Sequence, residues 1–193
     1  MQSTLSCIVC DQTISESVKK DLPVCQSCFD QVYNLEKQTI RKKKNEEADH
    51  ICDNLYLGSE NSVLDLEYLR RNKIDRIIVA AAFCDKKFNQ EEHQIAYLTL
   101  EIDDSPEEDI KKYFEETHSY INQNKETNVI VHCVSGISRS GTIVISYVMK
   151  HKNLRFQEAW EYVKSKRSIV YPNSGFQKQL LQYEQELFQE NQL

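Results

Sequence analysis

One stretch of the sequence, an apolar run that carries a cysteine into a glycine-containing loop, constrains the fold more than any other. Residues 129–141 read VIVHCVSGISRSG, and TIVISYVMK follows. Three β-branched residues at 129–131 predict a buried strand, and the apolar run after Arg139 predicts a buried helix. Gly136 permits a backbone turn that most residues resist. Because N–H groups converge where such a loop meets a helix N-terminus, and the helix dipole is positive there, the sequence predicts an anion-binding loop.

Cys133 lies at the bottom of this predicted loop, where the N–H groups should stabilise a thiolate and make it a nucleophile at neutral pH. Arg139 offers a planar fork of N–H donors that suits the oxygens of a phosphate. The alternative interpretation is a buried cysteine that packs as a small hydrophobic residue at a strand end. That alternative explains neither the arginine nor Gly136, so we expect the loop to bind a phosphoryl group and to attack it.

The same residues resemble a known family signature. The string HCVSGISRS at 132–140 resembles the signature of the cysteine-dependent protein tyrosine phosphatases, and its Ser-Arg-Ser-Gly ending is most similar to the dual-specificity branch. NLYLG at 54–58 resembles the usual opening of that family, and YPNSGF at 171–176 resembles the segment before its last helix. The resemblance extends from about residue 54 to residue 188, and residues 1–50 lie outside it.

The resemblance implies hydrolysis of phosphotyrosine, and of phosphoserine or phosphothreonine, in proteins through a phosphocysteine intermediate. The leaving oxygen needs a proton, which a carboxylic acid on a neighbouring loop can supply before it acts as base toward water. Asp103 and Asp104 are the candidates, and alignment on the following helix puts the family acid at Asp104. Ser140 is implied to donate a hydrogen bond to the departing thiolate. The predicted catalytic residues are Cys133, Arg139, Asp104 and Ser140, and the predicted substrate-binding residues are Val134, Ser135, Gly136, Ile137, Ser138 and Arg139.

Loop amides and an arginine supply the positioning and charge stabilisation that phosphoryl transfer needs, so we expect no cofactor for catalysis. Two other functions stay open. One is a phosphoprotein-binding adaptor with weak or no catalysis, which the intact Cys133, Arg139 and acid position disfavour. The other is a phosphatase of lipid headgroups or RNA 5′ ends, whose polyanionic substrates favour basic loop residues. The variable loop positions are neutral here, which favours protein substrates: Val134, Ser135, Ile137 and Ser138.

Two CxxC pairs near the N-terminus predict a metal site. The pairs are separated by 14 residues and consist of Cys7 with Cys10 and Cys25 with Cys28. Four thiolates suit a closed tetrahedral zinc site, and a helix after the second pair resembles the treble-clef arrangement of zinc knuckles. The alternative is four unrelated cysteines. A segment so poor in apolar residues needs the metal to fold, so this zinc is expected to be structural, and the module to recruit a partner that the sequence does not identify.

The chain is therefore expected to divide into a zinc module at 1–28, a polar helical linker at 29–49 and a catalytic domain at 50–193. In that domain, helices alternate with buried strands, which predicts an α/β fold with a mainly parallel central sheet flanked by helices. Ligands bind beyond the carboxyl ends of the strands in such sheets. The further strands are predicted near 55–57, 74–80 and 95–102, and the further helices at 63–71 with Asn61 or Ser62 as cap, from Ser105-Pro106 to about residue 122, at 154–166 and at 176–189.

Charge and hydropathy exclude several classes of partner. The net charge of −6 makes the chain a poor match for nucleic acid or an anionic membrane. No apolar run approaches the roughly 18–20 residues that cross a bilayer, and no secretory signal begins the chain. We therefore expect a cytoplasmic or nuclear protein that acts on phosphorylated proteins. His132 is expected to be buried and to orient the loop, and the remaining histidines to lie at the surface: His50, His93, His118 and His151.

Cys84 carries one further hypothesis. It follows the predicted strand at 74–80, so it should emerge at the same end of the sheet as Cys133 if the two strands are parallel neighbours. The segment at 84–88 also resembles a loop of lipid-phosphatase relatives in which a cysteine traps the oxidised nucleophile as a disulfide. The alternative is a loop cysteine without a role.

Overall fold

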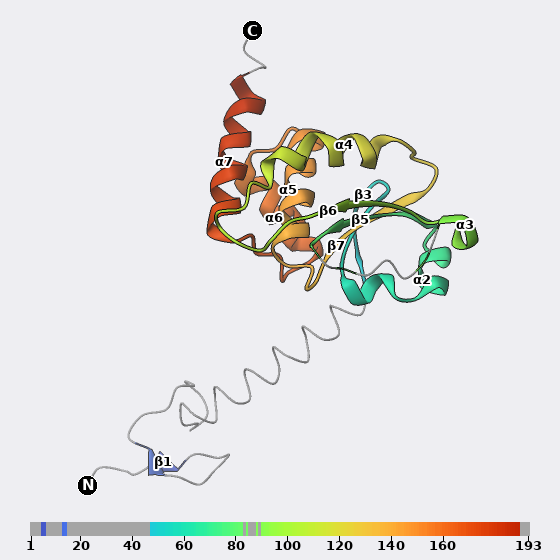
Figure 1. Ribbon diagram of the computed structural model, residues 1–193. Coiled ribbons are helices and arrows are strands. Elements are labelled where there is room, and N and C mark those ends of the chain that lie inside the picture. Colours follow the sequence, from blue (N-terminus) through green and yellow to red (C-terminus); the bar gives the residue numbers. More distant parts are fainter. Residues whose placement is uncertain are drawn as a thin grey trace. The chain divides into compact units, whose positions relative to one another are not determined.

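The computed structural model describes residues 47–82, 84, 88 and 90–189, together with two short strands, β1 (Leu5–Ser6) and β2 (Thr13–Ile14), which pair antiparallel (Figure 1). The chain forms two compact units, Met1–Lys43 and Lys44–Leu193. The four cysteines of the predicted zinc site and nearly all of the predicted helical linker lie outside the described residues. Residue 49 belongs to the first strand of the second unit.

The second unit contains a five-stranded mixed sheet in the order β3-β4-β7-β5-β6. Its strands are β3 (Asp49–Cys52), β4 (Leu55–Ser59), β5 (Ile74–Ala80), β6 (Ala96–Leu100) and β7 (Asn128–Cys133). The β4–β7, β7–β5 and β5–β6 pairings are parallel, whereas the edge strand β3 pairs antiparallel with β4. The prediction of a mainly parallel sheet omits β3, because its short segment DHIC has neither a long apolar run nor a clear alternation.

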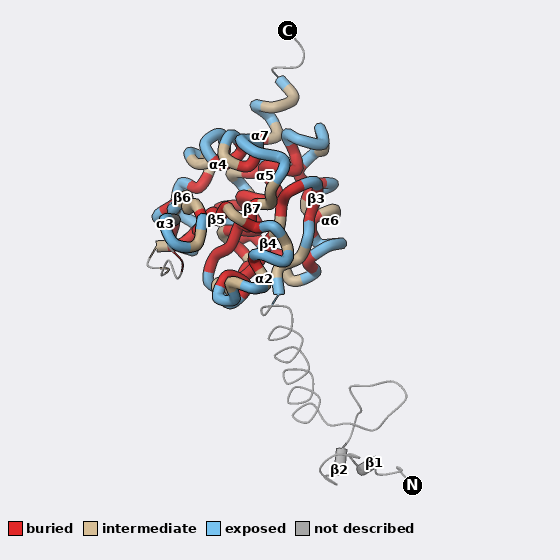
Figure 2. The backbone as a smooth tube through the Cα atoms, turned by 90° about the vertical axis from the view of Figure 1, so that its right-hand side faces the viewer, coloured by how far each residue is buried: buried red, intermediate tan, exposed pale blue. Residues whose placement is uncertain are grey.

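Helices cover both faces of this sheet (Figure 1). One face carries α4 (Phe114–Asn122), α5 (Arg139–Lys152), α6 (Phe156–Lys166) and α7 (Ser174–Gln189), and the other carries α2 (Leu66–Arg71) and α3 (Gln90–His93). Alternate residues of the central strands therefore enter two separate cores: Val129 and Val131 pack toward α5, and Ile130 packs toward α2. Burial on both faces explains the apolar runs at 77–80 in β5 and 129–131 in β7 (Figure 2).

The predicted helix start at Ser105-Pro106 is wrong. Residues 105–108 form a turn, the 3-10 helix η2 (Lys111–Tyr113) follows, and α4 begins only at Phe114. The carbonyl oxygen of the Gln179 side chain accepts hydrogen bonds from the backbone N–H groups of Ile110 and Lys111, both at 3.0 Å. The N–H groups that open this helix are thus satisfied by a residue 68 and 69 positions away, which local sequence signals do not reveal.

The helix predicted at 63–71 is also shorter than expected. A 3-10 helix, η1 (Glu60–Val63), precedes it, and Asp65 rather than Asn61 or Ser62 caps α2, because its carboxylate accepts from the N–H groups of Glu67 and Tyr68. Such a cap satisfies two of the open donors of the first turn.

His118 is buried rather than at the surface, with an exposed fraction of 4%. The buried positions of α4 are Phe114, Thr117, His118 and Ile121, which follow the helical repeat of three and four residues. His118 Nε2 lies 3.1 Å from Ser146 Oγ, and desolvation lowers the pKa of His118 to about 4. The ring is therefore neutral at pH 7 and belongs to the core.

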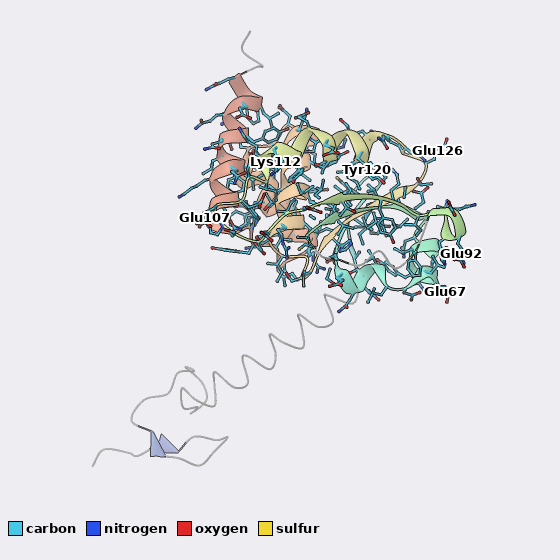
Figure 3. All side chains as sticks on the ribbon, viewed as in Figure 1. Glu67, Glu92, Glu107, Lys112, Tyr120 and Glu126 are labelled. Atoms are coloured by element: carbon cyan, nitrogen blue, oxygen red, sulfur yellow. The ribbon has the colours of Figure 1, made fainter. Side chains whose placement is uncertain are left out.

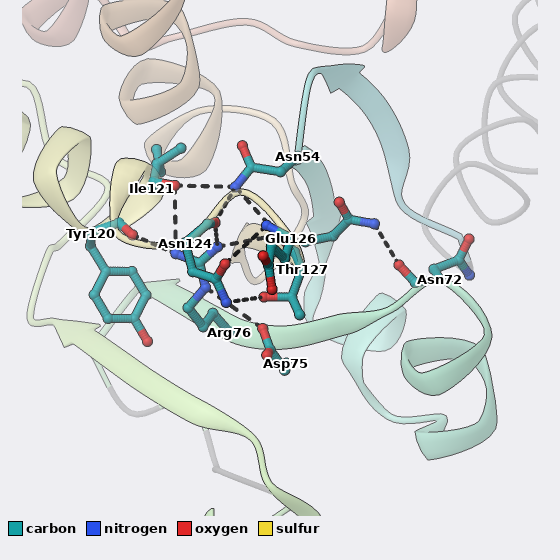
Figure 4. Close-up of polar contacts among 10 residues, drawn as sticks. Asn54, Asn72, Asp75, Arg76, Tyr120, Ile121, Asn124, Glu126 and Thr127 are labelled. Carbon is teal, nitrogen blue, oxygen red and sulfur yellow. Dashed lines mark hydrogen bonds and ion pairs between the residues drawn. The ribbon is translucent and has the colours of Figure 1, made fainter.

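A polar network closes the end of the sheet where the parallel strands begin (Figure 4). The buried Arg76 donates to the carbonyl oxygens of Tyr120 at 2.7 Å and Thr127 at 3.3 Å, and it also donates to Asn124. Asn54 donates to Asn124 at 2.9 Å. These donors satisfy carbonyl groups at the C-terminal end of α4 and in the following loop, which would otherwise lack partners.

Charged side chains such as Glu67, Glu107 and Glu126 are exposed and extend outward from the fold (Figure 3). In the part of the chain that the structure describes, no helix combines the length and apolar character that crossing a bilayer requires.

Candidate active site

Cys133 is the last residue of β7 and is completely buried. Its Sγ accepts hydrogen bonds from the backbone N–H of Gly136 at 3.3 Å and from the hydroxyl of Ser140 at 3.2 Å. The following helix α5 begins at Arg139, so strand, loop and helix meet around this sulfur as the sequence predicts. Two polar hydrogen atoms thus converge on the sulfur, the atom that the sequence predicts to be the nucleophile.

The loop between β7 and α5 turns its N–H groups inward. Four successive loop carbonyl groups accept hydrogen bonds from residues outside the loop. The pairs are Glu60 N–H to Val134 at 3.3 Å, Arg167 Nη2 to Ser135 at 3.4 Å, Arg167 Nε to Gly136 at 3.0 Å, and Tyr171 N–H to Ile137 at 3.0 Å. Because C=O and N–H point in opposite directions in a trans peptide, the N–H groups of the following residues, 135–138, face the inside of the loop. N–H groups that converge in this way form a cradle that suits an anion above Cys133.

Gly136 cannot be replaced without disturbing this loop. Its φ angle is +68°, a conformation that favours glycine, and a Cβ atom there would lie 2.4 Å from the carbonyl oxygen of Gly58. Gly58 is in β4, whose segment NLYLG carries part of the family resemblance. The two glycines let the loop pack directly on the backbone of the neighbouring strand.

Arg139 is the first residue of α5, which has no side-chain cap at its N-terminus. Arg139 Nη1 donates to the carbonyl oxygen of Ile102 at 3.2 Å. Its Nε is buried and has no hydrogen-bond partner among the described residues, while Asp104 Oδ2 lies 3.8 Å away. An uncapped helix N-terminus beside a guanidinium N–H that makes no hydrogen bond to the described residues fits the oxygens of a phosphate.

Asp104 is held against this loop, whereas Asp103 is not. Asp104 Oδ1 accepts from Ser138 Oγ at 2.7 Å and from Asn173 Nδ2 at 3.0 Å. Asp103 is exposed, and its side chain has no hydrogen bond or ion pair with any described residue. Of the two candidate acids, only Asp104 therefore has a defined position beside Arg139.

His132 is buried directly before the nucleophile. Its Nδ1 lies 3.3 Å from the carbonyl oxygen of Cys133, and desolvation lowers its pKa to about 4. A neutral ring that contacts the backbone can orient the start of the loop without adding a positive charge to the site.

Three residues outside the signature also shape the site. Tyr171 and Arg167 hold loop carbonyl groups, and Asn173 donates both to Asp104 and, through its backbone N–H, to Ser138 Oγ at 3.1 Å. Arg167 is missing from the sequence prediction because it lies in the basic segment KSKRS, where it looks like its exposed neighbours. Among the described residues, no cluster of three or more His, Cys, Asp or Glu side chains is arranged to hold a metal ion.

Comparison with known proteins identifies a family over most of the second unit. The family model described as "Dual specificity phosphatase, catalytic domain" matches residues 55–186. The putative tyrosine phosphatase 123R of Invertebrate iridescent virus 6 is 38% identical over 141 residues, which cover 72% of this chain and 92% of the viral protein. Human dual specificity protein phosphatase 16 is 39% identical over 140 residues, which cover 71% of this chain.

The chain spans only a small part of several relatives that it matches: 16% of two MAP kinase phosphatases with leucine-rich repeats from Dictyostelium discoideum and 21% of human dual specificity protein phosphatase 16. The solved structure of DUSP15 has a TM-score of 0.65 and 34% identity, with 76% of this chain and 96% of that chain covered. The human tyrosine phosphatase-like serine/threonine/tyrosine-interacting protein has a TM-score of 0.69 and 32% identity, with 74% and 99% covered. Together with the loop geometry, these matches show that the chain belongs to the dual-specificity phosphatase family.

Proposed function

We propose that this chain is a cysteine-dependent protein phosphatase that hydrolyses phosphotyrosine and phosphoserine or phosphothreonine through a phosphocysteine intermediate. The observation that carries the proposal is the inward-facing amide cradle above Cys133, closed on one side by Arg139, whose Nε has no hydrogen-bond partner among the described residues. Such a cradle stabilises the charge of a phosphoryl group in the transition state of its transfer, and the sulfur lies at the base of the cradle.

In the first step, the Cys133 thiolate attacks phosphorus and the bond to the ester oxygen breaks. Asp104 donates its proton to that oxygen, so the alcohol or phenol leaves neutral. Arg139 Nε makes no hydrogen bond to the described residues, and the Asp104 carboxylate lies 3.8 Å away. This N–H is therefore available to donate to a phosphate oxygen.

In the second step, water attacks phosphorus and the S–P bond breaks. Asp104, now a carboxylate, takes a proton from the water, and inorganic phosphate is released. The electrons of the S–P bond return to Cys133 as a thiolate, which Ser140 Oγ at 3.2 Å and the Gly136 N–H at 3.3 Å are placed to stabilise. The cycle needs no cofactor.

The surroundings of the loop favour a peptide over a polyanionic lipid or RNA. The variable loop positions carry no charge. Two large hydrophobic side chains beside the site are exposed: that of Val134 in the loop to 52%, and that of Tyr171, whose backbone N–H donates to the loop, to 60%. Apolar surface beside a phosphate site suits the side chains that flank a phosphorylated residue, whereas polyanions favour additional cations.

A phosphopeptide panel with wild type and Cys133→Ser tests the proposal. Wild type should release phosphate from phosphotyrosine peptides and from at least some phosphoserine or phosphothreonine peptides. Cys133→Ser should bind these peptides without turnover, since serine fits the loop but is a far weaker nucleophile at neutral pH. Turnover by Cys133→Ser within tenfold of wild type refutes the mechanism. Peptide binding by wild type with no turnover identifies the adaptor instead, and a preference for phosphoinositides or RNA 5′ ends rules out the protein substrate.

We also propose, from the sequence, that four cysteines near the N-terminus hold one structural zinc ion and that this module recruits a partner. The support is the double CxxC spacing of Cys7, Cys10, Cys25 and Cys28. Elemental analysis of protein purified without chelator should give one zinc per chain, and Cys7→Ser or Cys25→Ser should lose it. Protein without zinc in that analysis contradicts the proposal.

A further inference from the structure

A buried arginine outside the signature loop holds two of the loop's carbonyl groups. We propose that Arg167 is a positioning residue of the active site and that Asp49 keeps its guanidinium in place. The proposal rests on the proposed function only in treating the loop as the site that binds the phosphate oxygens.

Arg167 is completely buried, although it follows the C-terminus of α6. Its donors point in two directions: Nε and Nη2 reach the carbonyl oxygens of Gly136 at 3.0 Å and Ser135 at 3.4 Å, and Nη1 reaches Asp49 Oδ2 at 2.9 Å. A buried guanidinium is costly unless it is paired and hydrogen-bonded. The Asp49 carboxylate supplies the countercharge, and the loop supplies acceptors.

These contacts set the direction of the amides that would bind phosphate. The Ser135 carbonyl shares its peptide plane with the Gly136 N–H, and the Gly136 carbonyl shares its plane with the Ile137 N–H. Because the C=O and N–H bonds of a trans peptide point in opposite directions, a guanidinium that draws both carbonyl groups outward turns both N–H groups inward. The Gly136 N–H already donates to Cys133 Sγ at 3.3 Å. Arg167 therefore acts through the backbone and does not itself touch the substrate.

The Arg167 side chain is fixed from two sides. Its backbone N–H donates to the carbonyl oxygen of Val163 at 2.8 Å, which ties it to the last turn of α6. Asp49 is the first residue of β3 and pairs with Leu57 of β4, next to the Gly58 carbonyl against which Gly136 packs. The loop geometry thus depends on β3 and α6, two elements that contribute no residue to the proposed chemistry.

Arg76 provides a matched control. It is also buried, with an exposed fraction of 6%, and it also donates to backbone carbonyl groups, including that of Tyr120 at 2.7 Å (Figure 4). It lies near the start of β5, where Ile74 pairs with Asn128 at the start of β7, whereas Cys133 ends β7. Removing Arg76 should therefore lower stability without altering the loop.

The experiment compares Arg167→Met, Arg167→Lys, Asp49→Asn and Arg76→Met in the full chain. Thermal unfolding gives stability, calorimetric titration with inorganic phosphate gives oxyanion affinity, and an aryl phosphate gives kcat and KM. We expect Arg167→Met to weaken phosphate binding and to lower kcat/KM at least tenfold, with a raised KM. Arg76→Met should lose a comparable amount of Tm, but its phosphate affinity and its kcat/KM should stay within twofold of wild type. The phosphate affinity and kcat/KM of Arg167→Lys should lie between those of wild type and Arg167→Met. A lysine ammonium lacks the planar fork with which the guanidinium reaches its three acceptors. Asp49→Asn should show a smaller loss in the same direction.

Equal phosphate affinity in Arg167→Met and Arg76→Met overturns the proposal, because Arg167 would then contribute stability alone. If Arg167→Met does not fold, unchanged phosphate affinity in both Arg167→Lys and Asp49→Asn overturns it instead. A wild-type protein that binds phosphate but hydrolyses no ester refutes the proposed function, while the binding data still decide the role of Arg167.

Discussion

Replacing Ser140 by alanine should slow the breakdown of the phosphocysteine and leave its formation nearly unchanged. Ser140 is completely buried, and its hydroxyl donates to Cys133 Sγ at 3.2 Å. The sulfur carries little charge in the phosphocysteine and becomes a thiolate as the S–P bond breaks, so this hydrogen bond strengthens in the second step. A hydrogen bond to a charged group contributes about 1.5–3 kcal/mol. At about 1.4 kcal/mol per factor of ten, breakdown should slow roughly 10- to 150-fold.

Stopped-flow measurement with an activated aryl phosphate separates the two steps. Ser140→Ala should release a burst of phenol equal to the enzyme concentration and then turn over slowly. Because kcat/KM reports only the steps through formation of the intermediate, it should stay within about threefold of wild type while kcat falls by the larger factor.

Ser146→Ala is a suitable control because Ser146 is a second buried serine of α5. Its hydroxyl donates to the Ile143 carbonyl at 2.8 Å and contacts His118, away from the nucleophile. This variant should keep wild-type kcat. If Ser140→Ala shows no burst and loses kcat and kcat/KM in equal measure, the hydrogen bond serves the nucleophile rather than the leaving thiolate, and the reasoning fails.

Three further predictions follow from the structure. Asp104→Asn should slow phosphotyrosine peptides by roughly 10²–10⁴-fold and activated aryl phosphates less; the same pattern in Asp103→Asn would identify the other aspartate as the acid. The free energy of unfolding, measured in urea, should fall by up to about 3 kcal/mol as pH drops from 6.5 to about 4, because His118 takes up its proton at a higher pH in the unfolded chain than in the folded protein. If His118→Gln leaves this pH dependence unchanged, the prediction is wrong. Cys84 follows β5, the parallel neighbour of β7; if it traps oxidised Cys133, peroxide treatment and non-reducing peptide mapping should give a Cys84–Cys133 peptide, and the absence of that peptide identifies a loop cysteine without this role.

Local signals were sufficient for the parts of the site that are continuous in the sequence. The β-branched run at 129–131, Gly136 and Arg139 predict a strand, a turn and a helix N-terminus, and the structure has β7, the loop and α5 there. These features depend on backbone preferences and on the N–H groups that every helix leaves open, so neighbours in the chain suffice to specify them.

The sequence by itself therefore determined that a cysteine stands between a buried strand and a helix, within a dual-specificity phosphatase signature. Only the tertiary structure decided which groups surround it. Arg167 reaches the loop because α6 ends beside β3, and Asp104, which the family resemblance already favoured over Asp103, is held beside the loop by Ser138 and Asn173. The physical reason is that these contacts join residues 31 to 118 positions apart. Contacts between residues so far apart depend on how helices and strands pack, and no local sequence pattern specifies that packing.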